Sequence, residues 1–292
     1  MDKERGYEAG TAAKHIGIRR KGRESGTAPE PFPWWEGTRA GTERYRALLE
    51  GALILFRYCG DEYQPRLIEE IASLFGRLPK GPPPREEEQR LFLTSILCSP
   101  NPGLGLEFLK TAGFAGEFWP ELAVLDSVDH SKEFHPEGNV WKHTMETFRY
   151  RKPVVNSRTS HDLVLSLGLL LHDTGKALAG MEGSHRFSGH AELGVRTARR
   201  FLDRLGFDPV LADAVCYLVK NHMLPAALPR LPLKRVEEVI TSPLFPALLE
   251  LYRCDESSSF KGPDGYYESS AAYQSYLKHR HNPYRSADGK KT

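Results

Sequence analysis

The chain has 292 residues, of which 40% are hydrophobic and 27% are charged, and its formal net charge at pH 7 is +2. This length and composition suffice for one large hydrophobic core or two modest ones. No run of about 18 or more apolar residues occurs, and the N-terminal residues MDKERGYEAG lack the apolar segment of a signal peptide. We therefore expect a cytoplasmic protein that does not contact a membrane.

Residues 1–40 are rich in Gly, Lys, Arg and Glu, include the basic cluster Arg19-Arg20-Lys21, and lack hydrophobic periodicity. These properties predict a disordered basic arm. Such an arm can contact RNA phosphates or remain a solvated tail. The aromatic cluster at its end, Pro31 to Trp35, can stack on bases or dock onto the helical body.

Residues 41–125 show helical patterns. The stretch TERYRALLEGALILFRYCG, from Thr42, has a Thr cap and a final Gly, and Gln64 to Arg77 repeats an apolar face. The turn-forming LPKGPPP precedes a third predicted helix from Arg85 to Cys98, and Asn101 to Trp119 predicts another that breaks near Gly113. The apolar face of the second helix is expected to contain Leu67, Ile68, Ile71, Leu74 and Phe75.

The stretch LVLSLGLLLHDTGK, Leu163 to Lys176, places His172 and Asp173 at the end of an apolar run. Gly175 and Lys176 follow directly. A buried helix would thus deliver two metal-ligand side chains to one point. The alternative is an ordinary helix C-terminus, with a capping polar pair and a basic residue near the last carbonyls.

Other polar side chains lie where apolar helical patterns begin, end or face inward: His143, His190, His222 and Asp255. Each histidine has a structural alternative: an early-turn helix residue for His143, a solvent-facing first-turn residue for His190, and an imidazolium that complements the helix dipole for His222. Asp255 follows LLELYRC near a predicted helix end, where the dipole disfavours a carboxylate. A ligand role therefore explains Asp255 better than a structural one.

The remaining patterns predict further helices. HAELGVRTARRFLDRLG has an apolar face and an arginine face, and ends at Gly206 and Pro209. The proline-rich stretch from Leu224 predicts a loop and two short helices that return Asp255 to the other polar residues. A last helix should pack its tyrosines, and residues 279–292 form a polar, mobile tail. The apolar face contains Leu193, Ala198, Phe201, Leu202 and Leu205, the solvated face contains Arg196, Arg199, Arg200 and Arg204, and the packing tyrosines are Tyr266, Tyr267, Tyr273 and Tyr276.

The cysteines Cys59, Cys98, Cys216 and Cys254 lie far apart, in or beside apolar helical patterns. This distribution predicts reduced, buried thiols rather than a disulfide framework or a zinc knuckle.

Several linked motifs carry a family resemblance: FHPEGNVWKHT, LLHDTGK, HRFSGHAELG and LYRCDESS, in this order. Their order resembles that of the HD superfamily of metal-dependent phosphohydrolases, from about Asp126 to Ser258. The closest resemblance is to the HD domain of bacterial tRNA nucleotidyltransferases and poly(A) polymerases. The segment REEEQRLFLTSILCSPNPGLGLEFLKTAGFAGEFWPEL resembles the neck of the same family. The resemblance implies an all-α fold, with a helical neck-like region over 41–125 and an HD-domain helical bundle over 126–278.

The resemblance also implies a site for divalent metal, with two ions drawn from Mn, Fe, Ni, Co, Mg or Zn. In the family pattern, a first ion is held by His143, His172, Asp173 and Asp255, while Asp173 bridges to a second ion held by His190 and His222. Asp173 and Lys176 would be catalytic, and Lys176 would neutralise phosphate charge. The loop residues His185 and His135 are candidates for substrate binding, and a surface role is the alternative for both.

The nucleotidyltransferase head of this family needs a Gly-Ser-type loop and paired aspartates, which do not occur between Met1 and Arg85. We therefore expect no CCA or poly(A) addition. The resemblance implies a phosphomonoesterase or phosphodiesterase that acts on a nucleotide, or on a 2′,3′-cyclic or terminal phosphate of RNA. The alternatives are a non-catalytic RNA- or tRNA-binding module, and a nucleotide-signal hydrolase for dinucleoside polyphosphates or an alarmone. The sequence leaves the metal, the substrate and the oligomeric state open.

Overall fold

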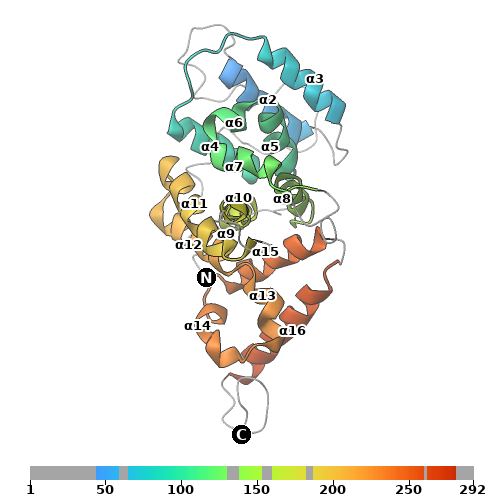
Figure 1. Cartoon of the computed structure of the whole chain (residues 1–292), viewed down its shortest axis with the longest axis vertical. Coiled ribbons are helices and arrows are strands. Elements are labelled where there is room, and N and C mark those ends of the chain that lie inside the picture. Colours follow the sequence, from blue (N-terminus) through green and yellow to red (C-terminus); the bar gives the residue numbers. More distant parts are fainter. Residues whose placement is uncertain are drawn as a thin grey trace, which may run out of the picture.

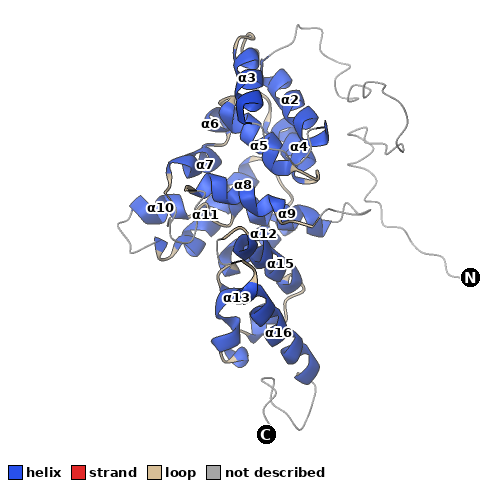
Figure 2. Cartoon of the chain, turned by 90° about the vertical axis from the view of Figure 1, so that its right-hand side faces the viewer, coloured by secondary structure: helices blue, strands red, loops and turns tan. Residues whose placement is uncertain are grey.

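The computed structural model describes residues 44–58, 65–129, 138–152, 160–181, 187–259 and 262–280. The predicted basic arm, the aromatic cluster at its end, Cys59 and residues 281–292 lie outside these ranges. Regular secondary structure in the described ranges is helical, apart from one isolated bridge between Asp129 and Asn139 (Figure 2). The all-α prediction is thus confirmed.

The α-helices are α2 (Arg44–Tyr58), α3 (Pro65–Gly76), α4 (Glu86–Leu97), α5 (Pro102–Thr111), α6 (Phe114–Phe118), α7 (Pro120–Ala123), α8 (Val140–Arg149), α9 (Ser160–Leu171), α10 (Lys176–Met181), α11 (His190–Arg204), α12 (Pro209–Asn221), α13 (Leu224–Ala227), α14 (Glu237–Ile240), α15 (Phe245–Ser257) and α16 (Asp264–His279). Short 3-10 helices are η2 (Val124–Ser127), η4 (Leu228–Arg230) and η5 (Leu233–Arg235).

The molecule is elongated, and its helices run from one end at α2 to the other at α16, except that α15 returns to the middle (Figure 1). Helices α2 to α7 form one end. Helices α8 to α12, together with α15, form the middle, and α13, α14 and α16 form the opposite end. No helix in the described ranges has the length and apolar character needed to cross a membrane.

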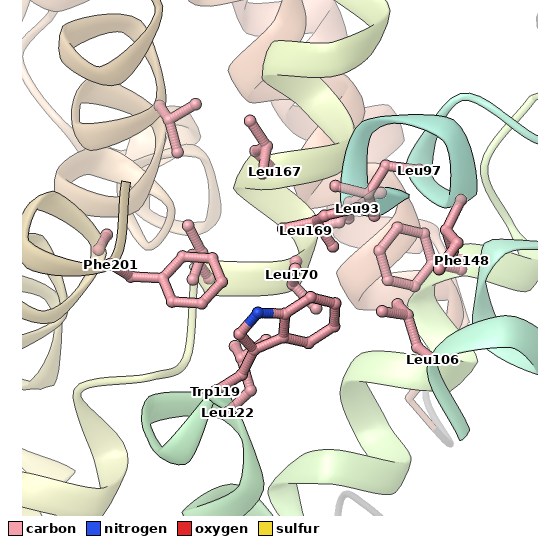
Figure 3. Packing of buried hydrophobic residues seen from close by; sticks show 14 of the residues in the cluster. Leu93, Leu97, Leu106, Trp119, Leu122, Phe148, Leu167, Leu169, Leu170 and Phe201 are labelled. Carbon is pink, nitrogen blue, oxygen red and sulfur yellow. The ribbon is translucent and has the colours of Figure 1, made fainter. Parts of the chain in front are cut away.

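A continuous hydrophobic core joins the end formed by α2 to α7 to the middle of the molecule (Figure 3). Trp119, just before α7, is buried, and its indole meets the ring of Phe201 on α11 edge-on, with 6.4 Å between ring centroids. The Trp119 Nε1 donates to Gln89 Oε1 on α4 at 3.0 Å. A single side chain therefore contacts both the predicted neck-like region and the predicted HD region.

The predicted helices of the N-terminal half are confirmed, including the break at Gly113, which has a φ of 82° between α5 and α6. One side chain differs from the prediction. Leu74 was expected on the buried face of α3, but it is 60% exposed. At 3.6 residues per turn it lies about 120° around the helix from the buried Ile68. The buried face is narrower than the apolar pattern indicated.

Two expectations in the C-terminal half need correction. The expected solvated face of α11 is partly paired, because Arg204 donates to Phe118 O at 3.0 Å and to Glu121 Oε2 at 2.8 Å, and Arg199 pairs with Asp213. On α16, Tyr276 is buried, but Tyr267 is 64% exposed and does not pack as expected. Tyrosines on successive turns of α16 thus do not all face the body.

The proline-rich segment does bring Asp255 back toward the middle of the molecule, but on a longer helix than expected. Helix α15 has 13 residues, and Pro246 lies in its first turn. A proline is tolerated there because the first N–H groups of a helix have no intrahelical acceptor. Among the described residues, Cys98, Cys216 and Cys254 form no disulfide bond, and Cys98 is only half-buried.

The buried side chain of Arg151 links the predicted neck-like region to the predicted HD region by hydrogen bonds. The side chain of Arg151, after α8, is buried, and its guanidinium donates to the carbonyl oxygen of Leu97 at 2.7 Å, to that of Ser99, and to Ser166 Oγ at 2.5 Å. Burial lowers the pKa of Arg151. The guanidinium satisfies carbonyl groups at the C-terminal end of α4, which have no intrahelical donor.

Replacing Arg151 by methionine should lower the free energy of unfolding by about 2–4 kcal/mol, because buried carbonyl groups lose their donor. Chemical denaturation measures this change. The matched control is Arg149→Met, where the arginine side chain is 67% exposed and pairs with Glu146, so a change of about 0.5 kcal/mol or less is expected. Equal losses for the two variants would contradict the assigned role.

Candidate metal centre

The structure brings the predicted ligand residues to one place in the middle of the molecule, from separate helices (Figure 1). They are His143 in the first turns of α8, His172 and Asp173 directly after α9, His190 at the start of α11, His222 at the end of α12, and Asp255 in the last turn of α15.

The carboxylate of Asp173 lies between two pairs of histidines. Its Oδ2 is 3.2 Å from His172 Nε2 and 3.8 Å from His143 Nε2. Its Oδ1 is 3.6 Å from His190 Nε2 and 3.8 Å from His222 Nε2. Each oxygen of one buried carboxylate therefore faces a different pair of imidazoles.

The potential donor atoms form two groups. In the first, the donor atoms of His143, His172 and Asp255 lie within 4.8 Å of one another, and His143 Nε2 is 2.9 Å from Asp255 Oδ1. In the second, those of Asp173, His190 and His222 lie within 4.8 Å of one another. Either group has enough nitrogen and oxygen donors for a divalent ion, and Asp173 also reaches toward the first group.

The other ring nitrogen of each histidine is held by a hydrogen-bond partner. The Nδ1 atoms face Leu169 O at 2.9 Å (His172), Phe187 O at 2.8 Å (His190), Val219 O at 2.7 Å (His222) and Ser258 Oγ at 3.3 Å (His143). A carbonyl oxygen can only accept, so in His172, His190 and His222 the Nδ1 carries the proton. The Nε2 atoms then face the centre, as in histidine metal sites, and those of His190 and His222 lie 3.0 Å apart.

The electrostatics favour neutral imidazoles on the side of His190 and His222. Burial lowers the pKa of His222 to about 4, and the nearby charge of His172 adds to this. Burial also lowers the pKa of His190, against the opposing effect of Asp173. A neutral imidazole is the form that binds metal. An imidazolium at the end of α12, the structural alternative for His222, is disfavoured by the same burial.

For Asp255, the effect of burial on the pKa is outweighed by that of its neighbours. Burial raises the pKa of its carboxyl group, but the close contact with His143 and the proximity of His172 outweigh that effect, and the net pKa is lowered. Asp255 therefore stays ionised although it lies in the last turn of α15, where the helix dipole is unfavourable. Its histidine neighbours supply the compensation.

The donor set fits a borderline to hard divalent ion. His172 Nε2 is fully buried and has no hydrogen bond to any described residue, which is a costly arrangement unless another group binds it. The thiol of Cys254, the residue directly before Asp255, is buried, and burial raises its pKa to about 12. Nitrogen and carboxylate donors without a thiolate suit Mn, Fe, Co, Ni, Zn or Mg.

Three side chains of this centre are partly exposed. The side chains of Lys176, His190 and Asp255 are 11%, 12% and 22% exposed, whereas the side chains of the other ligand residues are 1–2% exposed. Lys176 Nζ donates to Asp173 Oδ2 at 2.6 Å. The lysine predicted to neutralise phosphate charge is thus partly exposed and in contact with the central carboxylate.

A close backbone contact, which sequence reasoning missed, positions Asp173 against α11. A Cβ atom built on Gly175 would lie 1.9 Å from His190 O and 2.4 Å from Gly194 N, so this site excludes any side chain. The glycines in HDTGK and HAELG were the available signal. Their contact brings the turn after α9 next to the first turn of α11, which places Asp173 beside His190.

Two predicted substrate-binding residues, His135 and His185, lie outside the described residues. Ser258, which lies against His143 and donates to Asp255 O at 2.6 Å, was not predicted. Its only sequence signal was its position three residues after Asp255.

Comparison with known proteins gives one family match: residues 140–244 match the HD domain model. The chain is 30% identical over 226 residues to the CC-adding tRNA nucleotidyltransferase of Thermus thermophilus. The matched region covers 73% of this chain and 50% of that protein. It is 35% identical over 127 residues to the multifunctional CCA protein of Halorhodospira halophila. This second matched region covers 44% of this chain and 29% of that protein. The chain thus spans half or less of the length of these relatives.

Proposed function

We propose that the HD domain of this chain, which occupies residues 140–244, together with Asp255 from α15, forms a metal-dependent phosphohydrolase. The observation that carries this proposal is the position of Asp173, whose two carboxylate oxygens face separate pairs of histidine Nε2 atoms. A buried carboxylate placed in this way can serve as the bridging ligand of a two-metal hydrolytic site.

In this proposal, His143, His172 and Asp255 hold one divalent ion, His190 and His222 hold a second, and Asp173 bridges the two. Bound there, the ions would lower the pKa of a water molecule and polarise the phosphoryl oxygens of the substrate. The depressed pKa values of His190 and His222 support this role, because their imidazoles are neutral and available as ligands at pH 7.

Lys176 supplies positive charge at the centre. Its ammonium group lies 2.6 Å from Asp173 Oδ2 and is partly exposed, so an entering phosphate group can meet it. A lysine acts on phosphate as a point charge and does not impose a fixed geometry. We assign Asp173 and Lys176 the catalytic roles, with Asp173 orienting the reacting groups and Lys176 neutralising phosphate charge.

The proposed substrate is a nucleotide, or a 2′,3′-cyclic or terminal phosphate of RNA. The Thermus thermophilus relative supports this choice, since it is a CC-adding tRNA nucleotidyltransferase. The same similarity supports contact with RNA. A panel of nucleoside monophosphates, 2′,3′-cyclic nucleotides and dinucleoside polyphosphates, assayed with one metal at a time, tests the class of substrate. Release of pyrophosphate would instead favour a nucleotide-signal hydrolase.

The metal content of the purified protein should be about two ions per chain, and should fall toward one in His190→Ala and in His222→Ala. Elemental analysis after dialysis measures this. The matched control is His279→Ala, which removes a histidine on α16 outside the centre and should leave the metal content unchanged.

Other outcomes of that measurement have different meanings. One ion that is unaffected by either variant would restrict metal binding to His143, His172, Asp173 and Asp255, and would contradict the two-ion assignment. Absence of metal under all loading conditions, together with salt-dependent RNA binding, would favour the non-catalytic RNA-binding module.

A further inference from the structure

Phe187 has an unusual backbone conformation beside the metal centre. Its φ is 63°, and it is the one residue other than glycine with a positive φ in the described ranges. A bulky side chain rarely adopts the left-handed region, because the Cβ atom crowds the backbone. Surrounding contacts must therefore hold Phe187 in place, and such residues gather at functional sites.

The carbonyl of Phe187 has a definite partner. Its oxygen accepts a hydrogen bond from His190 Nδ1 at 2.8 Å. In His172 and His222, the equivalent bond goes to the carbonyl three residues earlier, Leu169 and Val219, within the same helical stretch. These three histidines thus use the same acceptor position, three residues before the ring.

The helix supplies this carbonyl automatically for His172 and His222, but not for His190. His190 is the first residue of α11, so Phe187 lies outside that helix, in a 3-10 turn. The acceptor is delivered instead by a turn in which both Phe187 and Gly189, with φ of 63° and 76°, are left-handed. The left-handed conformation of Phe187 therefore supplies an acceptor that α11 itself does not.

The ring of Phe187 has a second contact with the centre. The Lys176 ammonium lies 5.9 Å from the ring centroid, within the range of a cation–π interaction. Phe187 thus touches groups at the starts of both α10 and α11. This contact explains why an aromatic residue occupies a position where glycine would adopt the same backbone without strain.

We propose that Phe187 is a positioning residue for His190. Its left-handed backbone holds the carbonyl that keeps the His190 proton on Nδ1, and so directs Nε2 toward Asp173 and His222. The metal-binding consequence rests on the proposed function, whereas the placement of the proton does not.

The test compares Phe187→Val, Phe187→Gly and the control Tyr267→Val, which removes an exposed aromatic ring from α16. A β-branched valine disfavours the left-handed conformation, whereas glycine adopts it readily. Nitrogen-15 NMR of metal-stripped protein, with the His190 signals identified from their loss in His190→Gln, reports which ring nitrogen carries the proton. Titration with Co²⁺, followed by its visible absorption, reports binding of each ion.

We expect His190 to be protonated on Nδ1 in the original chain, in Phe187→Gly and in Tyr267→Val, and to shift toward the Nε2 form in Phe187→Val. Binding of the ion on the His190 side should weaken by about tenfold or more in Phe187→Val only. Circular dichroism verifies that each variant is folded.

The inference is overturned if His190 of the original chain carries its proton on Nε2, or if Phe187→Val keeps the original proton position and metal affinity. Equal losses in Phe187→Gly and Phe187→Val also overturn it, because the ring and not the carbonyl would then be responsible. If no variant binds Co²⁺ but the proton positions are as expected, the inference about Phe187 stands and the proposed function fails.

Discussion

Replacement of Asp173 by alanine should reduce phosphoester hydrolysis by at least about 10³-fold. Asp173 is the carboxylate that faces both pairs of histidines, and it also accepts the hydrogen bond from Lys176. Its loss would remove the proposed bridge between the two ions and leave the lysine without its carboxylate partner. Steady-state turnover of the best substrate from the panel measures the effect.

The control for this variant is Asp213→Ala. Asp213 is an aspartate on α12 with a 71% exposed side chain, paired with Arg199, and its replacement should leave turnover unchanged. Circular dichroism should show that both variants keep their helices. Turnover at the original rate in a folded Asp173→Ala protein would contradict the catalytic assignment. Lost turnover together with lost helicity would show a defect of folding, and Asp173→Asn would then separate charge from shape.

Replacement of Gly175 by alanine should lower the free energy of unfolding by about 3 kcal/mol or more. The added Cβ would overlap backbone atoms of His190 and Gly194, and backbone cannot move aside by rotating a side chain. The turn after α9 and the start of α11 must then separate, which moves Asp173 away from His190. Denaturation curves measure the loss of stability, and metal titration measures the separation.

Gly116→Ala is the matched control. Gly116 lies in α6, and a Cβ atom there would have no neighbour within 4 Å. Alanine favours a helix over glycine, so this variant should be equally stable or more stable, by up to about 1 kcal/mol. If Gly175→Ala unfolds at the same denaturant concentration as Gly116→Ala and binds metal normally, the close contact does not position the centre.

The residues of the centre could be predicted from sequence because each carries a chemical signal. Histidine and aspartate at the ends of apolar helices, in a family order, mark His172, Asp173 and Asp255 before any geometry is known. The helices themselves followed from periodicity. Leu74 was misplaced because an apolar residue about 120° from the centre of a helix face fits the pattern without reaching the core.

The supporting contacts could not be predicted, because they involve backbone atoms from distant segments. Arg151 has a carbonyl of α4 among its acceptors, and no side chain of complementary charge marks that partner in the sequence. Gly175 meets the backbone of α11, and Phe187 uses its own carbonyl. Each contact depends on how helices pack against one another, which a pattern within one segment does not contain.

The position of Trp119 bears on how this domain can be exchanged between proteins. Its indole ring fills space between α4 and α11, so the hydrophobic core does not stop where the HD match begins at residue 140. A gene fragment that started there would encode an open half of that core, with Phe201 facing water. The unit that can be transferred with its core intact is therefore larger than the matched HD region, and a recombination that transfers the candidate metal centre must transfer α4 to α7 with it.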